Sequence, residues 1–183
     1  MTKYLFILCL TFLLSGCFTV FKVADKKEDG YFYASEEATV VVSKKFNLDS
    51  LRAVILVPNG DFTKGMVQNI RYFGRVINFD ELEKEIIQNN KQDEVGSIIG
   101  NIGLNNAYRK YMPFLYLKLE TIKKEGNIEK VQLKLINPSD FSEIFVDETP
   151  LDYVWRGVND QYTFYPLFNG LIKYVKSNSK TFK

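Results

Sequence analysis

The amino-acid sequence predicts an α/β protein, a two-layer sandwich in which helices pack on one face of a mixed sheet. The apolar run 53–57 stops at Pro58-Asn59-Gly60, which is typical of a covered central strand. Apolar and polar residues alternate over 115–119 and again over 131–135, with turn-forming residues between them. This alternation predicts an antiparallel hairpin that begins a meander. Helical apolar spacing in the segments around these strands supplies the second layer.

The remaining elements follow from local patterns. Phe62, Met66, Ile70 and Phe73 form one stripe of a helix, which Gly74 is suited to end. The other expected strands lie at 38–42, 75–79 and 144–146, and the other expected helices at 80–88, 105–112 and 165–177.

Three short segments carry turn, loop or cap signals. Asp80 followed by Glu83 has the spacing of an acidic capping box. Gly96–Gly103 is glycine-spaced and apolar, which predicts a loop or a tightly packed turn. Residues 18–30 carry a charge cluster and are interpreted as a tether, and the alternative for 31–33 is an extra edge strand.

The first 16 residues have the layout of a secretory signal. Lys3 is positive, and the apolar run Tyr4–Leu14 is shorter than the roughly 20 residues that span a bilayer. The run ends in Leu14-Ser15-Gly16-Cys17, which resembles the lipobox of bacterial lipoproteins. That resemblance implies that Cys17 is acylated and becomes the new N-terminus. The alternative is an ordinary secretory signal followed by an unrelated cysteine.

The same resemblance gives a location and a domain division. Phe18 follows the cysteine, where many Gram-negative lipoproteins held at the inner membrane carry Asp. We therefore expect the periplasmic face of the outer membrane, with the inner membrane as the alternative. The expected parts are a signal peptide, 1–16; a lipid-anchored tether, 17–35; and a single globular domain, 36–183.

Composition excludes several chemistries. The chain has no histidine, which excludes Ser-His-Asp machinery and histidine-ligated zinc. Cys9 leaves with the signal and Cys17 is the lipid site, so the mature chain has no thiol for a disulfide or a redox pair. Formal net charge is +2, and loss of Lys3 leaves about +1, which argues against a nucleic-acid partner.

Catalytic motifs are incomplete. Gly60 and Gly65 have phosphate-loop spacing, but Met66 and Val67 stand where that motif needs Lys and Ser or Thr. Ser97 between Gly96 and Gly100 lacks both the nucleophile-elbow spacing and a histidine base. A carboxylate cluster is interpreted as a solvated edge, with a glycosidase pair or a calcium site as alternatives: Asp140, Glu143, Asp147, Glu148 and Asp152. No catalytic, cofactor-binding or metal site is predicted.

An aromatic segment before the last helix offers candidate partner-binding residues: Trp155, Arg156, Tyr162 and Tyr165. Trp, Tyr and Arg are favoured anchors at interfaces. The alternative is that these side chains cover the sheet and belong to the core. We expect Trp155 to point inward and the two tyrosines to lie at the surface.

The order of elements also resembles small envelope lipoprotein modules, among them TolB N-terminal-like domains and auxiliary lipoproteins of lipid-transport systems. The strand–turn–helix over 57–73 and the closing helix from Tyr165 carry this resemblance. No motif specific to one family stands out, so the resemblance assigns no functional residues. Our first hypothesis is a non-enzymatic lipoprotein that binds or scaffolds a partner in the envelope, without a cofactor. The alternatives are an auxiliary binder of lipid or another apolar ligand, and a carboxylate-based glycan hydrolase.

Overall fold

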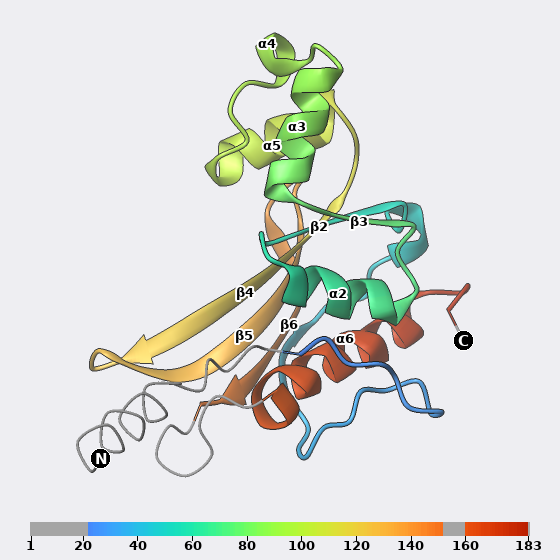
Figure 1. Ribbon diagram of the computed structural model, residues 1–183, viewed down its shortest axis with the longest axis vertical. Helices are drawn as coiled ribbons and strands as arrows, with labels where there is room; N and C mark the ends of the chain where they lie inside the picture. The colour runs from blue at the N-terminus through green and yellow to red at the C-terminus, as the bar shows by residue number, and fades with distance from the viewer. Residues whose placement is uncertain (1–21, 152–159, 183) are drawn as a thin grey trace, which may run out of the picture.

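The computed structural model describes residues 22–151 and 160–182, which form one six-stranded mixed sheet with helices around it (Figure 1). The strand order is β1-β6-β5-β4-β2-β3. The strands are β1 (Thr39–Ser43), β2 (Val54–Val57), β3 (Arg75–Asn78), β4 (Leu115–Lys124), β5 (Asn127–Asn137) and β6 (Ser142–Pro150). β2 runs parallel to β3 and β4, whereas β4, β5, β6 and β1 are antiparallel neighbours. The predicted mixed sheet with an antiparallel meander is confirmed.

The helices alternate with the early strands, and a long helix closes the chain. They are α2 (Asp61–Ile70), α3 (Phe79–Gln88), α4 (Gln92–Val95), α5 (Gly100–Lys110) and α6 (Tyr165–Asn178), with a 3₁₀ turn at Leu48–Ser50 and a π turn at Asp160–Phe164. Among the described residues, no helix is both long and apolar enough to cross a membrane.

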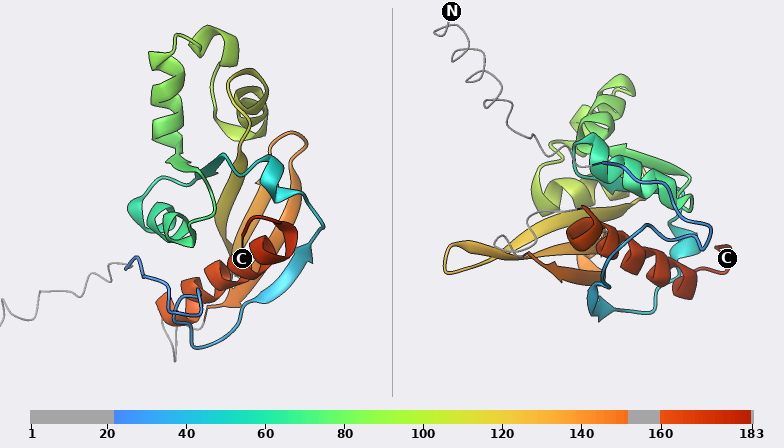
Figure 2. Two further views of the ribbon diagram at one scale, coloured as in Figure 1. Left: turned by 90° about the vertical axis from the view of Figure 1, so that its right-hand side faces the viewer. Right: turned by 60° about the horizontal axis from the view of Figure 1, so that its bottom comes forward.

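Helices α2 and α6 lie side by side over one face of the sheet (Figures 1 and 2). Ile55 and Val57 of β2 point into the large core beneath them. Val54 and Leu56 point the other way, into a smaller core with α3 and α5. All four β2 residues are buried, as the continuous apolar run requires. The α2–α6 layer matches the predicted packing on one face, and α3 with α5 additionally covers the opposite face at the β2 end.

Local signals at the helix starts differ from those expected. The capping box of α3 uses Asn78 and Glu81: the Asn78 side chain accepts from the Glu81 amide, and the Glu81 carboxylate accepts from the Asn78 amide. Asp80 with Glu83 is therefore the wrong pair, because the N-cap of α3 is Asn78, two residues before Asp80. α5 begins at Gly100 within the expected loop, since Gly103 lets the helix approach the backbone of Ser97 and Ile98.

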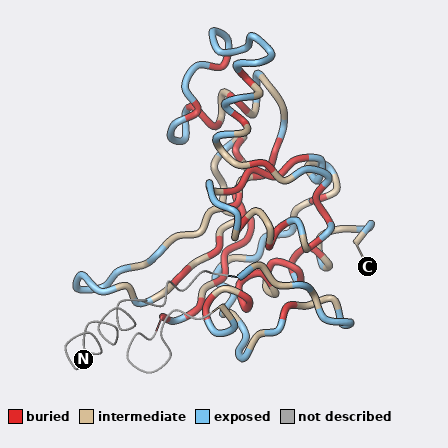
Figure 3. The backbone as a smooth tube through the Cα atoms, in the orientation of Figure 1, coloured by how far each residue is buried: buried red, intermediate tan, exposed pale blue. Residues whose placement is uncertain are grey.

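The segment before β1 belongs to the domain and is not a separate tether. Phe32 is fully buried in the large core, and Val23, Ala24 and Tyr31 pack against that core. The rest of this segment is a mixture of exposed and intermediate residues (Figure 3). The interpretation of 17–35 as a tether is thus corrected for its described part, 22–35. The charge cluster before Phe32 suggested an exposed tether, whereas the buried Phe32 side chain anchors this segment to the core. Residues 31–33 do not form a strand either.

A groove beside the open edge of the sheet

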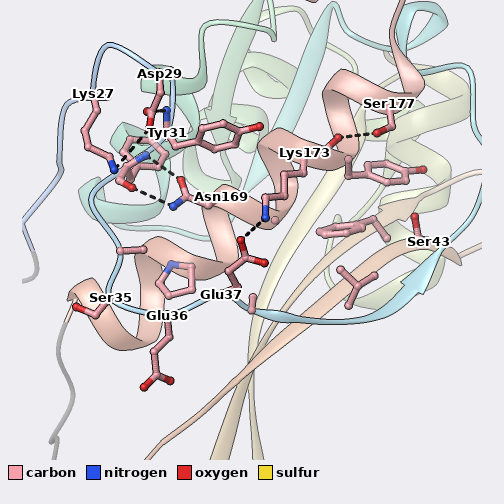
Figure 4. A pocket seen from close by; sticks show the side chains of 18 residues that line it. Lys27, Asp29, Tyr31, Ser35, Glu36, Glu37, Ser43, Asn169, Lys173 and Ser177 are labelled. Atoms are coloured by element: carbon pink, nitrogen blue, oxygen red, sulfur yellow. Dashed lines mark hydrogen bonds and ion pairs between the residues drawn. The ribbon is translucent and has the colours of Figure 1, made fainter.

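A groove of about 540 Å³ lies between α6, β1 and the segment before β1 (Figure 4). Phe145 of β6 and Tyr174 of α6 stack at its base, with ring centroids 4.7 Å apart. Val40 and Ser43 of β1 form its outer wall. The groove therefore combines an aromatic base with one wall made of backbone at the edge of the sheet.

Asn169 of α6 holds the opposite wall in place. Its side-chain oxygen accepts from the Phe32 amide at 2.8 Å, and its side-chain nitrogen donates to the Phe32 carbonyl at 3.0 Å. This pair of bonds satisfies both backbone groups of Phe32, as a neighbouring strand would. One helix turn further on, Lys173 Nζ lies 2.7 Å from the carboxylate of Glu37 (Figure 4). Specific hydrogen bonds and an ion pair therefore hold this wall of the groove in place.

β1 is an open sheet edge, because among the described strands it pairs only with β6. Its sequence Thr-Val-Val-Val-Ser contains no charge, and the side chains of Val40 and Val41 are about half exposed. β3, at the opposite edge, starts with Arg75, which pairs with Glu85, and runs directly into α3. Charged or covered edges resist strand addition, whereas an uncharged exposed edge invites it.

Asp147 lies beneath the groove and is fully buried. Neither of its carboxylate oxygens has a hydrogen-bond partner among the described residues. A Cβ on Gly170 of α6 would lie 2.0 Å from Asp147 Oδ2, so glycine is needed where the helix crosses this residue. Burial raises the pKa of the Asp147 carboxyl to about 9. The expectation of a solvated edge is wrong for this residue.

The other carboxylates of the sequence cluster do not converge on Asp147. Glu143 and Glu148 lie on the opposite face of the sheet, where they pair with Lys134 and Lys130 respectively. The hydrogen bond from Lys130 lowers the pKa of the Glu148 carboxyl. Asp140 accepts from the Ser142 amide in the turn before β6.

Asp152 lies outside the described residues. Within the described ranges, no group of three potential metal ligands comes together. Alternation along β6 places Glu148 on the face opposite Asp147. The register shift of the β5–β6 pairing between Leu135 and Ile136 places Glu143 on that opposite face as well.

Of the four predicted partner-binding residues, the structure describes Tyr162 and Tyr165, and these two differ in burial. Trp155 and Arg156 lie outside the described residues. Tyr162 is 36% exposed, as expected of a surface tyrosine. The expectation for Tyr165 is wrong: its ring lies in the large core, and its hydroxyl donates to the Lys22 carbonyl at 2.9 Å. The segment around residue 22 covers this tyrosine, and no local pattern could reveal that contact.

The groove was not predicted from the sequence, although the sequence pattern of the strand that forms one of its walls was present. Thr39–Ser43 is an uncharged β-branched run with Glu36 and Glu37 before it and Lys44 and Lys45 after it. Such a run predicts a strand, but only the strand order places it at the edge.

Comparison with protein-family models gives no match, and neither curated proteins nor solved structures match the chain. The fold and the groove are therefore the basis for any functional proposal.

Proposed function

We propose that the protein is a non-enzymatic lipoprotein of the bacterial envelope that holds a polypeptide partner along β1 and the adjoining groove. Cys17 carries the lipid anchor, and the domain faces the periplasm from the outer membrane. The observation that carries the proposal is the open, uncharged edge of β1 beside a groove with an aromatic base. An extended peptide can add to such an edge by backbone hydrogen bonds, while alternate side chains enter the groove.

The geometry favours a polypeptide over a lipid. The groove has charged groups along its rim, including Lys27, Glu36, Glu37 and Lys173, above the aromatic base. Small-ligand sites are mostly apolar with few polar groups. An apolar ligand resting on Phe145 and Tyr174 is the second candidate, because these stacked rings offer it a flat surface.

Acid–base chemistry on a glycan has less support. A general acid needs a raised pKa and access to substrate. Asp147 has the raised pKa but is fully buried. Glu120 has the opposite shift, since hydrogen bonds from Lys118 and Lys134 lower its pKa.

The anchor is tested with Cys17→Ala. We expect this variant to lose palmitate labelling and to leave the membrane fraction, because the thiol is the acylated group. Labelling equal to that of the unchanged chain would refute the lipoprotein assignment.

Partner binding is tested by a photo-crosslinking residue placed at Val41 in the anchored protein within its own cells. Ile87 on α3 is the matched control, because it is 55% exposed and Val41 is 52% exposed. We expect a crosslinked polypeptide from position 41 and none from position 87. Equal products from both positions, or none from position 41, would contradict the proposal.

A further inference from the structure

The residues that flank β1 have opposite charges at its two ends. Glu36 and Glu37 precede the strand, and Lys44 and Lys45 follow it. The Glu37 carboxylate is 83% exposed although it pairs with Lys173, and both lysines are exposed. An antiparallel neighbour that complements this edge must carry basic residues beside the glutamates and acidic residues beside the lysines.

A second copy of this chain meets that requirement. We infer that the partner held along β1 is another molecule of the same protein, with the two β1 strands paired antiparallel about Val41. This inference rests on the proposed function and names its partner. Centred on Val41, the pairing places Glu37 of each copy opposite Lys45 of the other. Opposite charges directly across two strands stabilise the pair, and like charges destabilise it. A parallel arrangement would instead place the glutamates together.

The symmetry agrees with anchoring in one membrane. Antiparallel strands of one sheet are related by a two-fold axis perpendicular to that sheet, so both α6 helices lie on the same face. The described chain starts on that face, where Lys22 accepts from Tyr165 and donates to Asp160. The two described chain starts at Lys22 therefore lie on the same side of the paired sheets.

The inferred pairing between the two β1 strands is short. A register shift between Val40 and Val42 marks a bulge at Val41, which increases the local twist. Pairing is thus confined to about the length of β1, and the charged residues at its ends set the register.

The first test uses Val41→Cys in the membrane-anchored protein, oxidised under mild conditions. Residues directly opposite in antiparallel strands have Cα atoms about 4.5–5.5 Å apart, which a disulfide can bridge. No other thiol competes, because Cys9 is removed and Cys17 is acylated in the proposed protein. We expect a disulfide-linked dimer from Val41→Cys and none from the equally exposed Ile87→Cys. Equal yields from both, or no dimer from position 41, would overturn the inference.

The second test uses Glu37→Lys and Lys45→Glu in detergent-solubilised protein, with mass measured by light scattering. Each variant alone places like charges opposite each other twice, so we expect about tenfold weaker self-association. An equal mixture of the two variants makes both pairs complementary again, so we expect dimers to return. Recovery in the mixture also excludes misfolding as the cause. A mixture that stays monomeric, or single variants as dimeric as the unchanged chain, would overturn the inference.

Failure of this inference is separable from failure of the proposed function. If position 41 crosslinks to a different polypeptide and the cysteine and charge variants give no effect, the partner is another protein and the proposed function stands. If position 41 behaves like position 87 in every assay, both proposals fall.

Discussion

At the scale of single residues, Asp147 is the most unusual group in the described structure. A buried carboxyl without a hydrogen-bond partner is costly as an anion, so it holds its proton in the folded state. No charged side chain from α6 compensates it, because Gly170 is the residue that crosses above it. Its strand neighbours by register are Val40 of β1 and Leu133 of β5, which are apolar.

This environment predicts a pH-dependent stability. Folding raises the Asp147 pKa from 3.8 to about 9, so between these values the folded chain holds a proton that the unfolded chain releases. Stability is therefore lost as pH rises through this window, by at most about 1.4 kcal/mol per pH unit. We expect Asp147→Asn to flatten the dependence of the unfolding free energy between pH 5 and pH 8 in urea titrations.

Glu148→Gln is the matched control for that measurement. Its carboxylate is the next one along β6, but its pKa is lowered by Lys130, so it stays ionised throughout the same window. The control is expected to keep the slope of the unchanged chain. An Asp147→Asn slope identical to that of the control would mean that the carboxyl is already ionised in the fold.

At the scale of elements, α6 organises the groove by holding the segment before β1 on one side and β6 on the other. Asn169 bonds both backbone groups of Phe32, and Tyr174 stacks on Phe145 while its hydroxyl donates to the Lys44 carbonyl at 2.7 Å. Asp49 fixes the chain just after the end of α6, where its carboxylate accepts hydrogen bonds from the Ser179 hydroxyl and from the Lys180 amide. These contacts make the segment before β1 a structural part of the domain.

We therefore expect Phe32→Ala to lower the free energy of unfolding by about 3–5 kcal/mol, the usual range for a buried phenylalanine. Tyr33→Ala is the control, since Tyr33 is the next residue and is largely exposed. It is expected to change stability by about 0.5 kcal/mol or less. Chemical denaturation measures both. Equal losses in the two variants would show that the segment lies on the domain without an anchoring side chain.

At the scale of the whole molecule, the described residues form two cores that share β2. The large core lies under α2 and α6, and the small one lies under α3 and α5. Because successive residues of a strand point to opposite faces, Ile55 belongs to the first core and Leu56 to the second. Figure 2 shows the two groups of helices on either side of the β2 end.

This division predicts different local effects from neighbouring substitutions. Ile55→Ala and Leu56→Ala are each expected to cost about 2–5 kcal/mol. Leu56→Ala is expected to speed amide hydrogen exchange mainly in α3 and α5, and Ile55→Ala mainly in α2 and α6. Exchange measured segment by segment distinguishes them. The same pattern from both variants would indicate one undivided core.

The sequence by itself determined the α/β class, the hairpin of β4 and β5, and the buried character of β2. Each of these depends on periodicity within a few residues, which reports which face of an element is apolar. The lipobox at Cys17 and the location that it implies stay predictions from sequence resemblance.

Only the tertiary structure determined where the groove lies and which residues surround it. Phe32 meets Asn169 across 137 positions, and Tyr165 meets Lys22 across 143. The burial of Asp147 depends on Gly170 in a different element, and the open edge at β1 depends on the order in which strands pair. Local patterns carry no information about such contacts, because the partners are distant in sequence and are brought together only by the packing of α6 on the sheet.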